Sequence, residues 1–204
     1  MKQLGKVGLV IVLLFTARTG VTFQKGTGDV IEQQIIDMLR QLDSLDERSR
    51  AKLLSQVDEQ RNELFGVLLM QLHRNPSKYT QAAVIFLMGR NRLSEAVGEL
   101  TKRIDFDAGR QPETAAESLW QRYPAVDALT TIGNSSLPPI LELLETDSVE
   151  LRRELAIRVL RRIEGADVAH YILETRLERT LDVQKRRQLQ DALSRLQKQM
   201  SGNK

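Results

Sequence analysis

The sequence predicts an all-α protein in which antiparallel helix pairs stack into an α-solenoid. Only 4% of the 204 residues are aromatic, and Leu, Arg, Glu, Gln and Ala, which favour helices, are abundant. From Asp29 onward, apolar residues recur at helical spacing, and no segment shows the period of two that is typical of a strand. One helical pattern also recurs at intervals of 31 to 44 residues, which indicates a repeat protein.

The first residues have the form of a secretory signal peptide. Lys2 and Lys6 accompany an uninterrupted apolar stretch from Val7 to Phe15, and small residues follow it. This stretch is well short of the roughly 20 residues needed to span a bilayer. We therefore expect residues 1–19 to be a signal peptide or an uncleaved anchor, and residues 20–28 to be a linker. The protein would be a periplasmic or secreted bacterial protein, membrane-anchored if the leader is not cleaved.

Residues 29–75 predict an N-terminal helical hairpin. One apolar stripe runs from Val30 to Leu45 and a second from Leu53 to Leu72. The second stripe ends at Asn75-Pro76, where proline disfavours further helix.

Residues 76–200 predict the repeat domain, and residues 201–204 a disordered tail. Four segments begin with a basic residue and continue with apolar residues at helical spacing; these basic residues are Lys78, Arg122, Arg153 and Arg186. The first interval is long because residues 105–118 form an insertion between units. We call each such helix an A helix, and we expect the last one to cap the stack with a polar outer face.

A second apolar helix, the B helix, follows each of the first three A helices after a turn that contains glycine. Gly89, Gly133 and Gly165 are placed to adopt the left-handed conformation that ends many helices. Ser136 and Asp167 are expected to cap the B helices that follow them. Such short helix pairs cannot bury both of their apolar faces alone, so they must stack. Alanines in the A helices would allow close approach of neighbouring helices.

The segment from Ala125 to Gly165 resembles HEAT repeats, particularly the short bacterial kind related to phycobilisome-lyase HEAT-like repeats, and the resemblance extends over residues 77–178. It implies a right-handed α-solenoid of HEAT-like helix pairs. It also implies that Asp147, in the turn after a B helix, pairs with Arg153 of the next A helix.

No arrangement of residues indicates catalysis, a metal or a cofactor. The only two histidines, His73 and His170, are far apart in the sequence, and the chain has no cysteine. Asp105 and Asp107 could ligate a cation, but a solvated acidic turn is the simpler interpretation. We therefore expect no enzyme activity and no cofactor.

A protein partner is the expected ligand, because stacked helices present an extended surface. The concave face would come from the B helices, with the exposed candidates Glu95, Glu99, Arg103, Glu142, Glu145, Glu174 and Glu178. Trp120 and Tyr123 could anchor a partner, although pinning the 105–118 insertion is the interpretation we favour.

The formal net charge of +3 lies in the leader, because Lys2, Lys6 and Arg18 are accompanied by no acidic residue there. Residues 21–149 carry 14 basic against 19 acidic residues, and residues 150–204 carry 13 against 8. In the C-terminal part, acidic residues three or four positions from the arginines predict pairs within helices. This polarity favours protein contacts or end-to-end self-association over nucleic-acid binding. Nucleic-acid binding through the C-terminal arginines and a chromophore lyase or chaperone-like activity remain the alternatives.

Overall fold

The computed structural model describes residues 61–74, 77–109 and 122–201. The expected leader, the linker, most of the N-terminal hairpin, Trp120 and residues 202–204 of the expected tail lie outside these residues, whereas Ser201 is helical and not part of a tail. The described part is all-α, with no strand. Its helices are α4 (Arg61–His73), α5 (Lys78–Arg90), α6 (Val97–Lys102), α7 (Pro124–Ile132), α8 (Leu137–Thr146), α9 (Glu150–Glu164), α10 (Ala166–Arg179) and α11 (Val183–Ser201). Two short 3-10 segments, η1 (Ser94–Ala96) and η2 (Gly133–Ser136), lead into α6 and α8.

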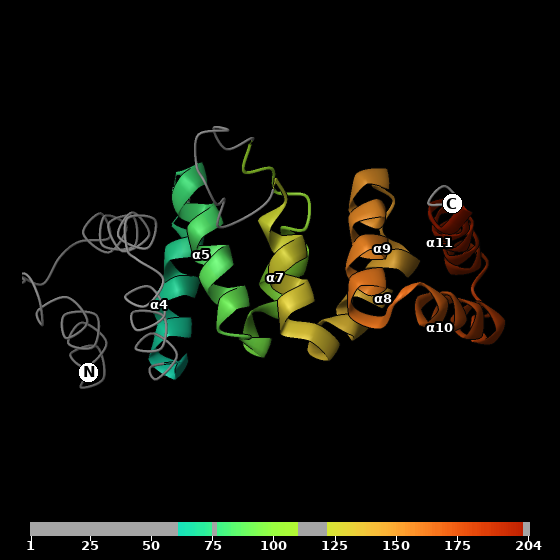
Figure 1. The fold of residues 1–204 in the computed structure, drawn as a ribbon, viewed down its shortest axis with the longest axis horizontal. Helices are drawn as coiled ribbons and strands as arrows, with labels where there is room; N and C mark the ends of the chain where they lie inside the picture. The colour runs from blue at the N-terminus through green and yellow to red at the C-terminus, as the bar shows by residue number, and fades with distance from the viewer. Residues whose placement is uncertain (1–60, 75–76, 110–121, 202–204) are drawn as a thin grey trace, which may run out of the picture.

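The helices follow one another along the longest axis of the molecule (Figure 1). Helix α5 packs against α4 and α7, and α7 packs against α9. Helices α8 and α9 are neighbours, and α6 contacts both α7 and α8. Helices α5, α7 and α9 therefore lie in the order predicted for the first three A helices.

The last two helices, α10 and α11, are placed differently from the earlier ones. Helix α10 runs across the direction of α9 in Figure 1, and α11 packs against α8 as well as against α9 and α10. The exposed residues of α11 beyond Val183 are all polar over positions 184–200. The predicted last A helix thus contacts an earlier B helix as well as the preceding pair.

The apolar positions predicted from the repeat pattern form the core. Val84, Ile85 and Met88 of α5 are fully buried, and so are Leu160 of α9 and Leu196 of α11. Each side chain of this size stabilises the fold by about 1.5–3 kcal/mol through its removal from water. In α10 the apolar Val168 is 45% exposed, while its neighbour Ala169 is buried.

Gly89 does not end its helix in a left-handed conformation, contrary to the expectation from the sequence. It lies inside α5, and the residue with positive φ after this helix is Arg92. A Cβ atom at Gly89 would lie 2.5 Å from the Cα atom of Ala128. Glycine is needed here because α5 and α7 approach too closely for any side chain.

The other two predicted glycines do end helices with positive φ. Gly133 and Gly165 follow α7 and α9 with φ of 81° and 82°, but their ψ angles of −138° and 167° place them outside the left-handed helical region, in an extended conformation that is almost exclusive to glycine. Ser136 occupies the predicted N-cap position of α8, but its side chain makes no capping bond, because its buried hydroxyl donates to the carbonyl of Leu129 at 2.9 Å. The predicted cap at Asp167 is wrong, since this residue lies within the first turn of α10 and Gly165 is the cap residue. Ser136 therefore links the end of α7 to the start of α8.

Among the described helices, none is both long enough and apolar enough to traverse a bilayer.

Candidate functional site

Arginine side chains connect helices that are far apart in the sequence. Arg152 of α9 donates from Nε to Asp147 at 2.7 Å and from NH1 to Asp105 at 2.8 Å, and it also reaches the carbonyl of Lys102 at 2.9 Å. The HEAT resemblance implies that Asp147 pairs with Arg153. In the structure Asp147 pairs with Arg152 instead. The difference arises because Arg153 points toward α11.

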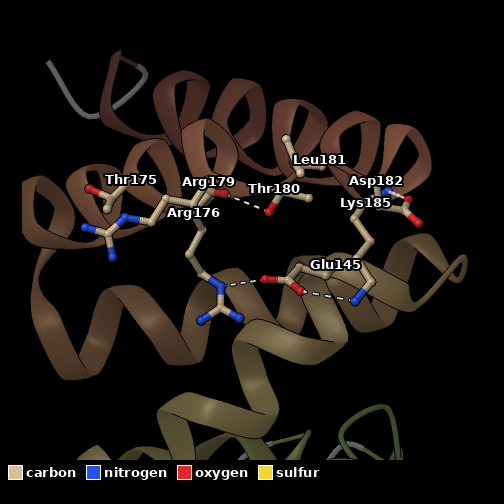
Figure 2. A pocket seen from close by; sticks show the side chains of 8 residues that line it. All are labelled: Glu145, Thr175, Arg176, Arg179, Thr180, Leu181, Asp182 and Lys185. Carbon is tan, nitrogen blue, oxygen red and sulfur yellow. Dashed lines mark hydrogen bonds and ion pairs between the residues drawn. The ribbon is translucent and has the colours of Figure 1, made fainter.

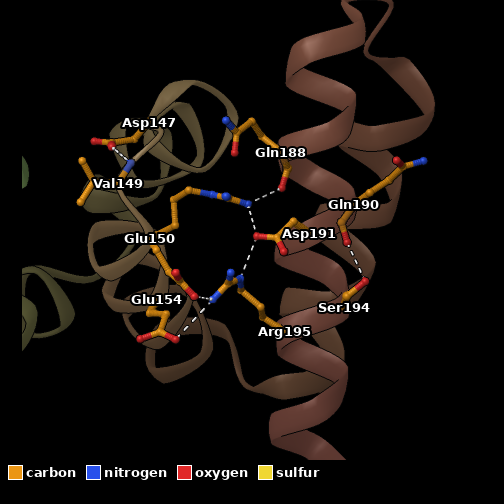
Figure 3. Close-up of polar contacts among 10 residues, drawn as sticks. Asp147, Val149, Glu150, Glu154, Gln188, Gln190, Asp191, Ser194 and Arg195 are labelled. Carbon is orange, nitrogen blue, oxygen red and sulfur yellow. Dashed lines mark hydrogen bonds and ion pairs between the residues drawn. The ribbon is translucent and has the colours of Figure 1, made fainter.

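Arg153 is part of a network between α9 and α11, several members of which are drawn in Figure 3. Its NH2 group donates to Asp191 at 2.5 Å and to the carbonyl of Gln188 at 2.9 Å. Arg195 donates from Nε to the same Asp191 oxygen at 2.7 Å and from NH1 to Glu150 at 2.9 Å. Burial opposes ionisation of Asp191, but the hydrogen bonds from Arg195 and Arg153 outweigh it and hold its pKa below the usual value.

These contacts correct the expectation that the C-terminal charges pair mainly within helices. Arg162 of α9 pairs with Asp127 of α7 at 2.6 Å, and Arg176 of α10 pairs with Glu145 of α8. Within α10 and α11 the pairs that do follow the predicted spacing are His170 with Glu174 and Arg195 with Asp191. The arginines thus fix the helices relative to one another.

The predicted partner-binding residues fall into three groups. Glu95, Glu142, Glu174 and Glu178 are exposed, as predicted. Glu142 and Glu178 make no side-chain hydrogen bond or ion pair with another described residue, whereas Glu95 accepts from the Ser94 hydroxyl at 3.3 Å. Trp120 lies outside the described residues.

Glu99 and Arg103 form the second group and are bound within the molecule. Glu99 accepts from Lys102 at 2.7 Å and from Arg103 at 2.6 Å, and it lies 3.2 Å from Nε2 of His73. The hydrogen bonds from Lys102, Arg103 and His73 outweigh partial burial and lower the pKa of Glu99 from 4.5 to about 2. This carboxylate connects α4 to α6 and is not a free surface charge.

Glu145 is the third case, because it is buried, whereas the sequence pattern predicts it on the surface. Its carboxylate accepts from Nε of Arg176 at 2.5 Å and lies 3.7 Å from Nζ of Lys185. A carboxylate can be buried where positively charged side chains lie this close to it. Glu145 thereby holds the C-terminal end of α8 to α10 and α11.

A pocket of about 400 Å³ opens where these three helices meet (Figure 2). It is lined by Glu145, Thr175, Arg176, Arg179, Thr180, Leu181, Asp182 and Lys185. Asp182 accepts from the backbone N–H of Lys185 at 2.9 Å and so caps the start of α11. Arg186 donates to the carbonyls of Leu177 and Thr180 and closes the end of α10. These two contacts fix the walls of the pocket.

This pocket was not predicted from the sequence. The C-terminal arginines were expected to pair along single helices, and nothing in the sequence pattern placed Lys185 and Leu181 at a common site. One signal was present, since Leu181 is an apolar residue in a polar turn between two helices. The meeting of α8 with α10 and α11 could not be derived from spacing along the chain.

No group of three or more potential metal ligands occurs among the residues that the structure describes. Asp105 accepts from Arg152, and Asp107 accepts from Nε and NH2 of Arg122 at 2.8 and 2.7 Å. The acidic turn at 105–107 is therefore held by arginines. The hydrogen bond from Arg122, with that from the N–H of Gly109, lowers the pKa of Asp107.

No protein-family model, curated protein or solved structure matches this chain.

Proposed function

We propose that this chain is an exported HEAT-like repeat protein, a right-handed α-solenoid that binds a protein partner through the face lined by its B helices. The observation that carries the proposal is the order of these helices. Helix α6 packs against α8, and Glu145 of α8 is ion-paired with Arg176 of α10. Successive B helices that adjoin in this way form an extended surface, which suits a partner segment better than a small molecule.

The charges along this surface support binding by contact with a protein. Glu142 and Glu178 are exposed and have no ion-pair partner among the described residues. Exposed charges without internal partners are available to complementary groups, and charge complementarity selects a partner and speeds its association.

The arginines of α9 give less support to nucleic-acid binding. Arg152, Arg153 and Arg162 are each paired with a carboxylate of another segment. Binding to a phosphate backbone depends on cations that can displace its counterions. An arginine that is already paired within the protein would lose that contact before it could bind a phosphate.

The partner-binding proposal can be tested by site-specific photo-crosslinking in the native cell. A photoreactive amino acid would replace Glu142 or Glu178 in the full chain, and Arg158 would serve as the control position. Arg158 is an exposed residue of α9 without a side-chain hydrogen bond or ion pair in the described part of the molecule. We expect a discrete adduct from positions 142 and 178 but not from 158. Equal labelling from all three positions, or no adduct from the first two, would contradict a binding face on the B helices.

Export requires a separate experiment, because it depends on the leader alone. Cell fractionation followed by mass spectrometry of the purified protein should yield an N-terminus at Gly20 outside the cytoplasm. An intact Met1 in the cytoplasmic fraction would disprove export and leave the scaffold proposal standing.

A further inference from the structure

The pocket between α8, α10 and α11 contains more hydrogen-bond donors than acceptors. Its two carboxylates are already engaged, because Glu145 accepts from Arg176 and lies beside Lys185, and Asp182 caps α11. Any additional ligand would therefore meet the remaining donors of the pocket.

Several donors that line the pocket have no acceptor among the described residues. Arg176 uses only its Nε atom in the pair with Glu145, so both of its terminal nitrogens are unpaired. The exposed Arg179 and the hydroxyl of Thr175 make no side-chain hydrogen bond. In Figure 2 the Arg179 side chain extends toward Thr175, while Arg176 points toward Glu145. Two guanidinium groups that present unpaired N–H donors are suited to a carboxylate, which accepts from such donors in a bidentate manner.

An apolar side chain also lines the pocket, on the side of Thr180 and Asp182 (Figure 2). Leu181 lines the pocket and is 92% exposed, and Val183, the first residue of α11, is 82% exposed. Two large apolar side chains in water at the edge of a cationic pocket favour a ligand that carries apolar groups beside its negative charge. An acidic peptide segment combines both groups.

We propose that this pocket binds a carboxylate side chain in an acidic segment of the protein partner, and that Leu181 packs against an apolar residue next to that carboxylate. The inference rests on the proposed scaffold function and names the chemistry of one part of its partner. A nucleic acid suits the pocket less well, because the three cations that line it, Arg176, Arg179 and Lys185, exceed its two carboxylates by only one charge, which matches a single carboxylate and not a chain of phosphates.

Fluorescence anisotropy with the purified mature protein would test the proposal. The probe is a labelled Gly/Ser peptide that contains a Glu-Glu-Leu motif. The control peptide carries Gln-Gln-Leu, and a single-stranded DNA oligonucleotide provides the polyanion. The protein variants are Arg179→Gln and Leu181→Ser, with Arg187→Gln as the matched control. Arg187 is an exposed arginine of α11 that does not line the pocket.

We expect the Glu peptide to bind and the Gln peptide to bind about tenfold more weakly, because a charge-assisted hydrogen bond is stronger than a neutral one. Arg179→Gln should weaken binding of the Glu peptide by about tenfold, and Leu181→Ser by severalfold. Arg187→Gln should leave it unchanged. All three substitutions are on exposed side chains, and circular dichroism would verify that the variants stay folded.

Equal affinity for the two peptides, or equal effects of Arg179→Gln and Arg187→Gln, would overturn the proposal. DNA binding that depends on Arg179 and exceeds peptide binding would also overturn it, in favour of a phosphate ligand. If crosslinking from positions 142 and 178 succeeds while the peptide fails, the pocket inference is wrong and the scaffold function stands. If the peptide binds through Arg179 while crosslinking fails, the pocket binds acidic segments and the proposed binding face is wrong.

Discussion

Gly89→Ala should destabilise the protein, although alanine is the better helix former. Gly89 lies in α5 where this helix contacts α7, and a Cβ atom there would lie 2.5 Å from the Cα atom and 2.7 Å from the Cβ atom of Ala128. Carbon atoms in contact normally lie about 3.5–4.0 Å apart. The nearest atom belongs to the backbone of α7, so the clash cannot be relieved by rotating a side chain. The two helices would have to separate locally by about 1 Å.

The size of the effect follows from two opposing contributions. Forcing an extra carbon into a packed core costs about 1–3 kcal/mol. Replacing glycine by alanine inside a helix returns up to about 1 kcal/mol. We therefore expect Gly89→Ala to lower the free energy of unfolding by about 1–2 kcal/mol.

Gly98→Ala is the matched control, since Gly98 also lies in a helix and a Cβ atom there would meet nothing within 4 Å. This variant should be unchanged or more stable by up to about 1 kcal/mol. Thermal unfolding followed by circular dichroism measures the difference between the two variants. The two variants should differ by about 1–3 kcal/mol, which at roughly 2–4 °C per kcal/mol for a domain of this size corresponds to melting temperatures about 2–12 °C apart. Equal melting temperatures would refute the close approach of α5 and α7.

The other predictions concern the charge contacts and one turn. Arg153→Ala should lower the free energy of unfolding by about 1–3 kcal/mol in urea titrations, because Asp191 and the carbonyl of Gln188 lose a donor; Arg158→Ala, at an exposed position of the same helix, should have almost no effect. Glu99 has a folded-state pKa of about 2 against a usual 4.5, so its contribution to stability is complete above pH 4.5 and is lost as the pH falls toward 2. Urea titrations at several pH values should therefore show a smaller loss of stability over this interval for Glu99→Gln than for the unchanged protein, and identical losses would contradict the assigned contacts. Gly165→Ala should destabilise by about 1 kcal/mol in the same assay, because Gly165 has a φ of 82°; a stabilised variant would show that the turn after α9 tolerates a side chain.

The helical pattern was predictable because it is local. The start of α5 at Lys78, the turns at Gly133 and Gly165, and the buried positions around Leu160 all follow from apolar spacing and glycine placement. The same reasoning failed at Gly89, where glycine serves contact with another helix and not the end of its own. Spacing along one helix cannot reveal how closely a second helix approaches it.

The pairing of charges was not predictable, because it depends on which helix ends meet. Acidic residues three or four positions from an arginine indicate pairs within one helix, yet Arg162 and Arg176 pair with Asp127 and Glu145 of other helices. The position of Glu145 in the sequence is that of an exposed residue, and its burial results from the approach of α10 and α11. Glu99 likewise contacts His73 of α4, which precedes it by 26 residues.

Apolar spacing along the chain predicts that the described part of this protein is helical, where its helices approximately lie, and which of their faces are apolar. These properties depend on interactions between residues a few positions apart, which the order of residues specifies directly. Only the tertiary structure decided which carboxylates are buried, which arginines retain unpaired donors, and where a pocket opens. These properties depend on the packing of α11 against α8 and α10, which brings together residues from distant parts of the chain.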